Sequence, residues 1–126
     1  MTAQNQDFEV SQGDTFTLQI PILHSDGSPV VLASPQGDWV LSQLDFPLEG
    51  DVPILLKGPS TGGITLAQNQ SNVWVMTVSF TAADTLNISA GKHYHEARVS
   101  DGATSRTVAV GIMTILPTIA RESYGQ

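Results

Sequence analysis

The sequence predicts an all-β domain, a sandwich or a barrel of about seven to nine short strands. Segments rich in β-branched and aromatic residues alternate with turn signals roughly every 8 to 15 residues, and no long segment has the period of an amphipathic helix. Near the C-terminus, Asp101-Gly102 separates extended runs at residues 92–100 and 106–116. This is a strong hairpin signal, because glycine tolerates positive φ and aspartate can accept hydrogen bonds from its own turn.

The N-terminal part begins with a polar segment, residues 1–6, which we expect to be a frayed tail. A short strand is predicted at 8–10 and a longer one at 15–23, where apolar and polar residues alternate. The apolar side of this longer strand carries Phe16, Leu18, Ile20 and Ile22. Pro21 cannot donate a ladder hydrogen bond, so it predicts an edge strand or a bulge. The segment 25–29, Ser-Asp-Gly-Ser-Pro, predicts a turn.

The middle of the chain predicts shorter extended pieces. Residues 30–32 form one candidate, and Gly37-Asp38 precedes a strand at 39–44. The proline- and glycine-rich segment 45–63 is predicted to be a loop, with a short edge strand at 54–57.

A second strand-rich region follows. Residues 64–67 predict a short strand, and residues 73–80 are rich in β-branched and aromatic side chains, which is typical of a central strand. The segment Thr81-Ala-Ala-Asp84 has the S/T-x-x-D pattern of a capped helix start, so a short helical turn is expected near residues 81–87. Gly91 limits its length, and residues 118–126 are predicted to be a C-terminal tail.

Length and composition exclude several classes of protein. A chain of 126 residues favours one domain, spanning 1–126. Its net charge of −7 argues against partners that are nucleic acids or anionic membranes. The absence of cysteine excludes disulfides and thiolate metal sites, and the N-terminal MTAQNQDFEV lacks the features of a signal peptide. The glycine-rich stretch 58–63 lacks the lysine of a phosphate-binding loop, so we predict no cofactor.

Two histidines raise the question of a metal site. His93 and His95 are two residues apart on a predicted strand, so their side chains point to the same face. A third ligand is required, and the sequence offers only His24 as a further histidine. We therefore predict no metal site, and expect the two rings to pack on a partly exposed face beside Ala97 and Val99.

The opposite face of the same strand carries Tyr94, Glu96 and Arg98. A carboxylate and a guanidinium in this arrangement can pair with each other or with a neighbouring strand. Catalysis by Glu96 would require a second acid or base and a pocket, and the sequence assigns neither. A structural ion pair or hydrogen-bond anchor is the preferred interpretation.

The aromatic residues are predicted to form the core, although a sugar-stacking platform is the alternative. Both interpretations concern Trp39, Trp74, Phe16, Phe80 and Tyr94. Tyr94 opens a late strand shortly after a glycine, as a tyrosine corner requires, in which the hydroxyl ties the preceding backbone.

Several of these segments together resemble a known family. In the C-terminal half the resemblance is carried by Asp84-Thr85-Leu86, Gly91, the run from Tyr94 to Gly102, Gly111 and the final Thr114-Ile115-Leu116-Pro117. In the N-terminal half it is carried by residues 12–16 and 26–32. The pattern resembles the small immunoglobulin-like domains of tailed-phage virion proteins, and is most similar to the immunoglobulin-like domain of the baseplate upper protein. The chain departs from the pattern at Gly91, which lies one residue further from Tyr94 than is common, and in the loop 45–63.

The resemblance implies an immunoglobulin-like antiparallel sandwich and a non-enzymatic structural accessory of the virion. Capsid decoration or cement is favoured over a small tail or baseplate component. The partners would be the major capsid protein or a tail or baseplate protein, with the chain homo-oligomeric or present in many copies. It would be made in the host cytoplasm and reside in the virion. The residues expected to act structurally are Trp39, Tyr94, Glu96, Arg98, Asp101 and Gly102.

The alternative is a module that binds host-surface glycan. It would use exposed aromatics, Trp74 and Tyr124, together with the loop 45–63.

Overall fold

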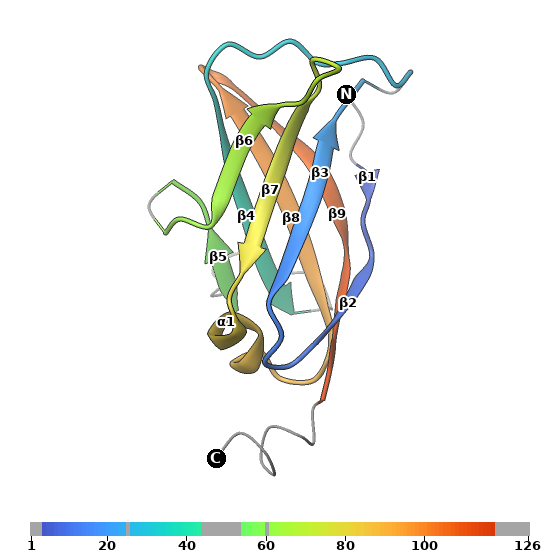
Figure 1. Ribbon diagram of the computed structural model, residues 1–126, viewed down its shortest axis with the longest axis vertical. Coiled ribbons are helices and arrows are strands. Elements are labelled where there is room, and N and C mark those ends of the chain that lie inside the picture. Colours follow the sequence, from blue (N-terminus) through green and yellow to red (C-terminus); the bar gives the residue numbers. More distant parts are fainter. Residues whose placement is uncertain (1–3, 25, 44–53, 60, 118–126) are drawn as a thin grey trace.

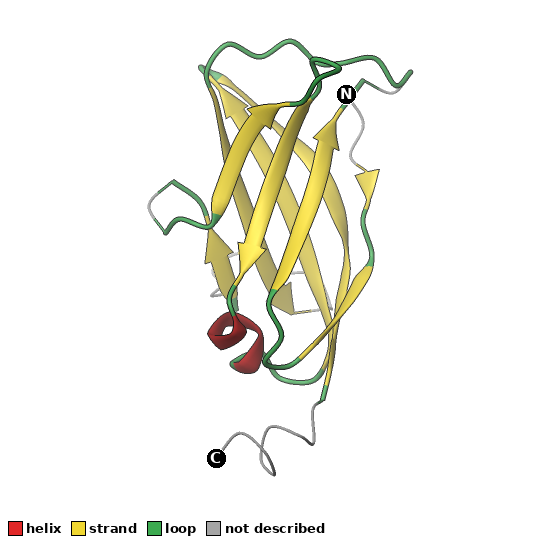
Figure 2. Ribbon diagram, in the orientation of Figure 1, coloured by secondary structure: helices red, strands yellow, loops and turns green. Residues whose placement is uncertain are grey.

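Two β-sheets pack face to face in the computed structural model, which describes residues 4–24, 26–43, 54–59 and 61–117 (Figure 1). Within these residues a six-stranded sheet has the order β1-β9-β8-β4-β5, with β2 also paired to β9, and a three-stranded sheet has the order β3-β7-β6. The elements are β1 (Gln4–Asn5), β2 (Phe8–Ser11), β3 (Phe16–Ile22), β4 (Pro35–Gln43), β5 (Leu55–Lys57), β6 (Ile64–Gln68), β7 (Trp74–Phe80), α1 (Ala82–Leu86), β8 (Gly91–Asp101) and β9 (Thr104–Leu116). The predicted all-β immunoglobulin-like sandwich is confirmed, with a single short helix in the described part (Figure 2).

The core lies between the inner faces of the two sheets. Leu18, Ile20 and Ile22 of β3 are buried, as their alternation with polar residues predicts. They meet β7, where the buried residues are Met76, Val78 and Phe80. The larger sheet contributes Trp39, Leu41, Ala97, Val99, Val108, Ala109, Met113 and Ile115. Removing this apolar surface from water is the main force that holds the layers together.

The edges of the smaller sheet agree with the sequence. β3 is an edge strand, which explains how it accommodates Pro21, and β7 is central, as predicted for residues 73–80. The turn after β3 is also confirmed, because Gly27 has φ +90° and the Asp26 carboxylate accepts hydrogen bonds from the backbone and hydroxyl of Ser28. These bonds lower the pKa of Asp26.

The hairpin β8–β9 forms as predicted. Asp101 pairs with Thr104, so Gly102 and Ala103 make the turn, and Gly102 has φ +66°. One detail was wrong: the Asp101 carboxylate does not bind its own turn. It accepts hydrogen bonds from the backbone N–H groups of Ala33 and Ser34 instead, at 3.1 and 2.8 Å.

Three other predictions about elements were wrong. Residues 4–5, expected to be part of a frayed tail, form β1 and pair in parallel with Ala109 and Val110 of β9. Residues 30–32 are not a strand. β4 begins at Pro35 rather than at residue 39, because the long strand β8 offers pairing partners over residues 98–101.

Gly37, predicted to precede the strand, lies inside β4. A Cβ at this position would lie 2.7 Å from the Met76 Sδ, so only glycine lets the two sheets approach there. Three predictions concern residues outside the described part of the chain. They are the strand end at Leu44, the loop at its residues 45–53 and 60, and the tail 118–126.

The helical turn α1 closes the end of the sandwich where β7 ends (Figure 1). Its capping box is confirmed: Thr81 accepts from the Asp84 N–H, and the Asp84 carboxylate accepts from the Thr81 N–H. The same carboxylate forms an ion pair of 2.6 Å with Lys57 of β5. Although burial acts in the opposite direction, these partners lower the pKa of Asp84. The helix is thus attached to the larger sheet.

Thr85 of α1 is fully buried and makes the second attachment. Its hydroxyl accepts from the Gly13 N–H at 3.0 Å and donates to the Asp14 carbonyl at 2.7 Å. The turn between β2 and β3 is therefore bonded to the helix through one side chain.

Replacing Thr85 by valine preserves volume but leaves the Gly13 N–H and the Asp14 carbonyl without this partner. We expect a loss of about 1–3 kcal/mol in the free energy of unfolding, measured by urea denaturation. Hydrogen exchange should become faster at the Gly13 amide. Thr85→Ser keeps the hydroxyl and should keep that amide protected; equal protection in the valine variant would contradict this role.

Candidate functional site

The two histidines of β8 lie inside the sandwich. His93 and His95 point to the same face, as predicted, but that face is the core and not a partly exposed surface. His95 is fully buried, and its Nδ1 accepts a hydrogen bond of 3.2 Å from the Trp39 indole N–H. An indole can only donate, so the Nδ1 carries no proton and the Nε2–H donates to the Gln6 carbonyl. His95 is therefore a neutral imidazole with both nitrogens occupied.

The position of Gln6 depends on a glycine. Gly111 is the register partner of His95 on β9, and a Cβ at this position would collide with the Gln6 carbonyl. The missing side chain lets the N-terminal segment cross β9 there and reach the imidazole. The neighbouring Asp7 carboxylate fixes the crossing by accepting from the Ile112 N–H at 2.9 Å.

Aromatic rings surround the His95 imidazole. The Phe8 ring lies edge-on to it with 5.0 Å between centroids, and Trp39 packs against Phe80 of the other sheet at 4.9 Å. Burial lowers the pKa of His95, although its bond to Gln6 and the charge of Asp7 act in the opposite direction. The group therefore stays neutral at physiological pH.

The structure does not bring the three histidines together. The His93 Nε2 lies 2.8 Å from the Ser89 carbonyl, and His24 is exposed on a distant loop. In the part of the chain that the structure describes, no group of three or more His, Cys, Asp or Glu side chains could hold a metal ion.

Tyr94, Glu96 and Arg98 occupy the outer face of the larger sheet. Tyr94 is therefore not a core residue, because the alternation of β8 directs the histidines inward. Burial, the charge of Glu96 and a hydrogen bond to it raise the pKa of Tyr94. Among the described residues no ion pair joins Glu96 to Arg98. The ion pair between Lys57 of β5 and Asp84 of α1 was not predicted. The tyrosine corner remains a prediction.

The remaining aromatics divide between core and rim. Trp39 is fully buried, and Trp74 is partly buried against the core at the start of β7. Among the described residues the Trp74 indole N–H is buried without a hydrogen-bond partner. Trp74 is thus not an exposed stacking surface, and Tyr124 lies outside the described residues.

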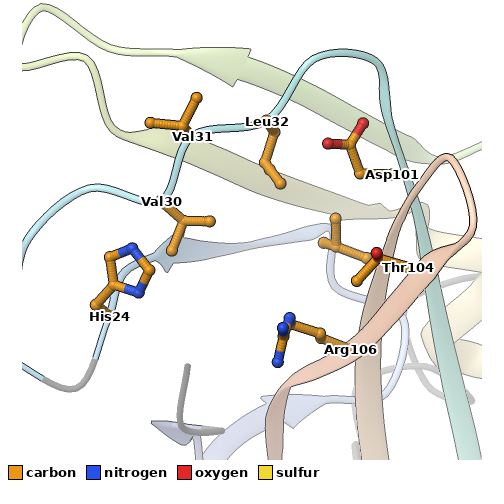
Figure 3. Close-up of a pocket in the computed structure, with 8 residues that line it drawn as sticks. His24, Val30, Val31, Leu32, Asp101, Thr104 and Arg106 are labelled. Atoms are coloured by element: carbon orange, nitrogen blue, oxygen red, sulfur yellow. The ribbon is translucent and has the colours of Figure 1, made fainter.

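An open cleft lies at the end of the sandwich that carries the tip of the β8–β9 hairpin (Figure 3). It has a volume of about 250 Å³. One wall is the segment after β3 and the other is the hairpin, and the lining residues are His24, Val30, Val31, Leu32, Val99, Asp101, Thr104 and Arg106. The two hydrogen bonds from Ser34 and Ala33 to Asp101 hold the walls together and lower the pKa of that carboxyl.

The cleft combines basic, hydroxyl-bearing and apolar side chains. Figure 3 shows His24 and Arg106 coming from opposite walls. Arg106 forms no ion pair with any described residue, so its guanidinium is available to an anionic or hydroxyl-bearing group. Val31 is 92% exposed and adds apolar surface. Asp101 is engaged with the backbone N–H groups of Ala33 and Ser34. Sequence reasoning missed Arg106, whose only signal was its place beside the predicted hairpin turn.

Comparisons with known proteins give little more. No family model matches the chain, and no curated protein matches it. A solved structure similar to the chain is a DUF4784 family protein from Bacteroides caccae, with 13% identity and a TM-score of 0.42. The match covers 92% of this chain and 23% of that one, so the chain spans about a quarter of the other protein's length. In the described residues no helix is long and apolar enough to cross a membrane.

The burial of His95 predicts a pH dependence of stability. Because the folded state lowers its pKa below the ordinary 6.5, the unfolded chain binds the proton more readily. The free energy of unfolding should be constant above about pH 7 and fall as the pH drops below about 6.5. Chemical denaturation between pH 5 and 8 measures this.

The matched variants are His95→Gln and His24→Gln. Glutamine at 95 can accept from Trp39 and donate to Gln6 without titrating, so its stability profile should be flatter between pH 5 and 7. His24 is exposed, and its replacement should keep the wild-type profile. Identical profiles for wild type and His95→Gln would show that the titration does not depend on this imidazole.

Proposed function

We propose that the chain is a non-enzymatic structural accessory of a tailed-phage virion, serving as capsid decoration or cement or as a small tail or baseplate component. The observation that carries the structural part is that His95, which raised the question of a metal site, and two acidic side chains are engaged in holding the fold. Both nitrogens of His95 are bonded, Asp84 is paired with Lys57, and Asp101 accepts two backbone N–H groups. The virion part rests on the resemblance of residues 84–117 to immunoglobulin-like domains of such particles.

The physical properties suit this role. A rigid sandwich offers edge strands and loops for docking, and only 13% of residues are charged, which favours broad polar contacts. On a symmetric particle many copies of a weak contact add up to firm attachment.

The test is the composition of purified particles. Virions from cultures that express the gene are separated on a density gradient and analysed by quantitative mass spectrometry. We expect the chain to sediment with the capsid and tail proteins at a constant copy ratio, and antibody labelling should place it on one of the two. An abundant chain in the lysate that is absent from particles would refute the proposal.

The cleft favours a second candidate, the binding of a host-surface glycan. Its apolar wall and the guanidinium of Arg106, which forms no ion pair with a described residue, fit an acidic sugar.

Glycan arrays with an Arg106→Gln variant test this second candidate. Binding of acidic glycans should fall at least about tenfold, as expected when a charge-assisted hydrogen bond is removed. Arg98→Gln removes the same charge from the outer face of the larger sheet and should leave binding unchanged. No binding by the wild-type chain, or equal loss in both variants, would exclude the cleft as a specific glycan site.

A further inference from the structure

The strand β6 presents an uncovered edge. It pairs with β7 on one side, and no described strand pairs with its other side (Figure 1). An unpaired edge is a row of N–H and C=O groups that can bind another strand. The direction of these groups follows from the bonds at the two ends of the β6–β7 ladder.

One backbone hydrogen bond lies just beyond each end of the β6–β7 pairing. The Ser79 N–H donates to the Gly63 carbonyl at 2.9 Å, and the Asn69 N–H donates to the Val73 carbonyl at 2.9 Å. In an antiparallel pair, hydrogen-bonded and non-hydrogen-bonded residues alternate. Gly63 and Asn69, which flank β6, are an even number of residues apart, so both bonds assign the same alternation of hydrogen-bonded and non-hydrogen-bonded residues to β6.

With this alternation, the backbone N–H and C=O groups of Thr65 and Ala67 bond to β7. The N–H and C=O groups that point away from β7 belong to Ile64, Leu66 and Gln68. These three residues are placed symmetrically about Leu66.

The other edges carry features that discourage pairing, and β6 does not. β3 contains Pro21, β5 has three residues including a lysine, β1 has two residues, and β2 has four residues including the exposed Glu9. The sequence of β6, Ile-Thr-Leu-Ala-Gln, has no charge and no proline. Native proteins protect exposed edges with such devices, so their absence at β6 indicates an edge that is paired in the working protein.

We propose that β6 pairs with β6 of a second copy, antiparallel about a two-fold axis at Leu66. Leu66 then lies opposite its own counterpart and Ile64 lies opposite Gln68, which satisfies every outward backbone group on both copies. The three-stranded sheet becomes continuous across the dimer.

The side chains at this edge fit a second copy of the same chain. Thr65 and Ala67 are exposed, small and uncharged, and would lie opposite each other across the axis. A chain of net charge −7 repels its own copies in general, so an uncharged strand is the place where two copies can meet. Beside the strand, a hollow of about 240 Å³ is lined partly by Ile64 and Leu66, whose half-buried side chains the second copy would cover. This inference does not depend on the proposed function.

Analytical ultracentrifugation of the full chain tests the proposal. The wild type should show a concentration-dependent monomer–dimer equilibrium. In the double variant Thr65→Lys/Ala67→Lys, each introduced ammonium group lies opposite one from the second copy, at two places across the axis. The dissociation constant of the dimer should therefore rise about tenfold or more. The double variant Thr17→Lys/Gln19→Lys places the same charges on exposed positions of β3, at the opposite edge of the same sheet, and should behave as the wild type does.

A charge swap makes the test specific. Thr65→Glu/Ala67→Glu should weaken the dimer in the same way, and an equimolar mixture of the lysine and glutamate variants should form a heterodimer. Circular dichroism confirms that each variant is folded. A wild type that is monomeric at every concentration would overturn the proposal. So would a lysine variant at β6 that dimerises normally, or a mixture that fails to associate.

Discussion

The buried hydrogen bonds from the Trp39 indole through His95 to the Gln6 carbonyl are the constraint on which most of the structure depends. When two sheets close over an indole and an imidazole, each polar atom left without a partner costs roughly 1–3 kcal/mol. Here the Trp39 indole N–H and both His95 nitrogens are bonded, and the bonds join β4, β8 and the N-terminal segment. Gly111 makes room for the carbonyl, and Phe80 brings the second sheet against the indole. The N-terminal strands are thereby held on the last strand of the larger sheet.

The same requirement accounts for other polar side chains in the described residues. His93, which the sequence offers as a metal ligand, has its Nε2 2.8 Å from the Ser89 carbonyl, and the Asp84 carboxylate is paired with the buried Lys57. The described surface offers backbone at the β6 edge and a cleft with the unpaired Arg106. An edge and a cleft of this kind suit attachment to other molecules, and many weak attachments suffice on a symmetric particle. The virion role is proposed on this basis together with the sequence resemblance.

Local signals in the sequence were reliable wherever the interaction partners are near each other in the chain. The period of two in β3, the edge signal of Pro21 and the positive φ of Gly102 each act within a few residues. The capping box of Thr81 and Asp84 spans three residues. Signals that concern partners far away were less reliable. The extension of β4 through Gly37 required knowledge of the long strand beside it, and Asp101 found its donors 67 and 68 residues away.

The sequence by itself determined the fold class, the positions of most strands along the chain, the hairpin and the capped helix, because hydrophobic alternation and turn chemistry are properties of short segments. Only the tertiary structure decided which face of β8 is buried, since His93 and His95 on one face and Tyr94 and Glu96 on the other give an ambiguous pattern. His95 became a core residue through partners 56 and 89 residues away, Trp39 and Gln6. The burial of a polar side chain depends on whether the folded chain brings it a donor or an acceptor, and no local pattern contains that information.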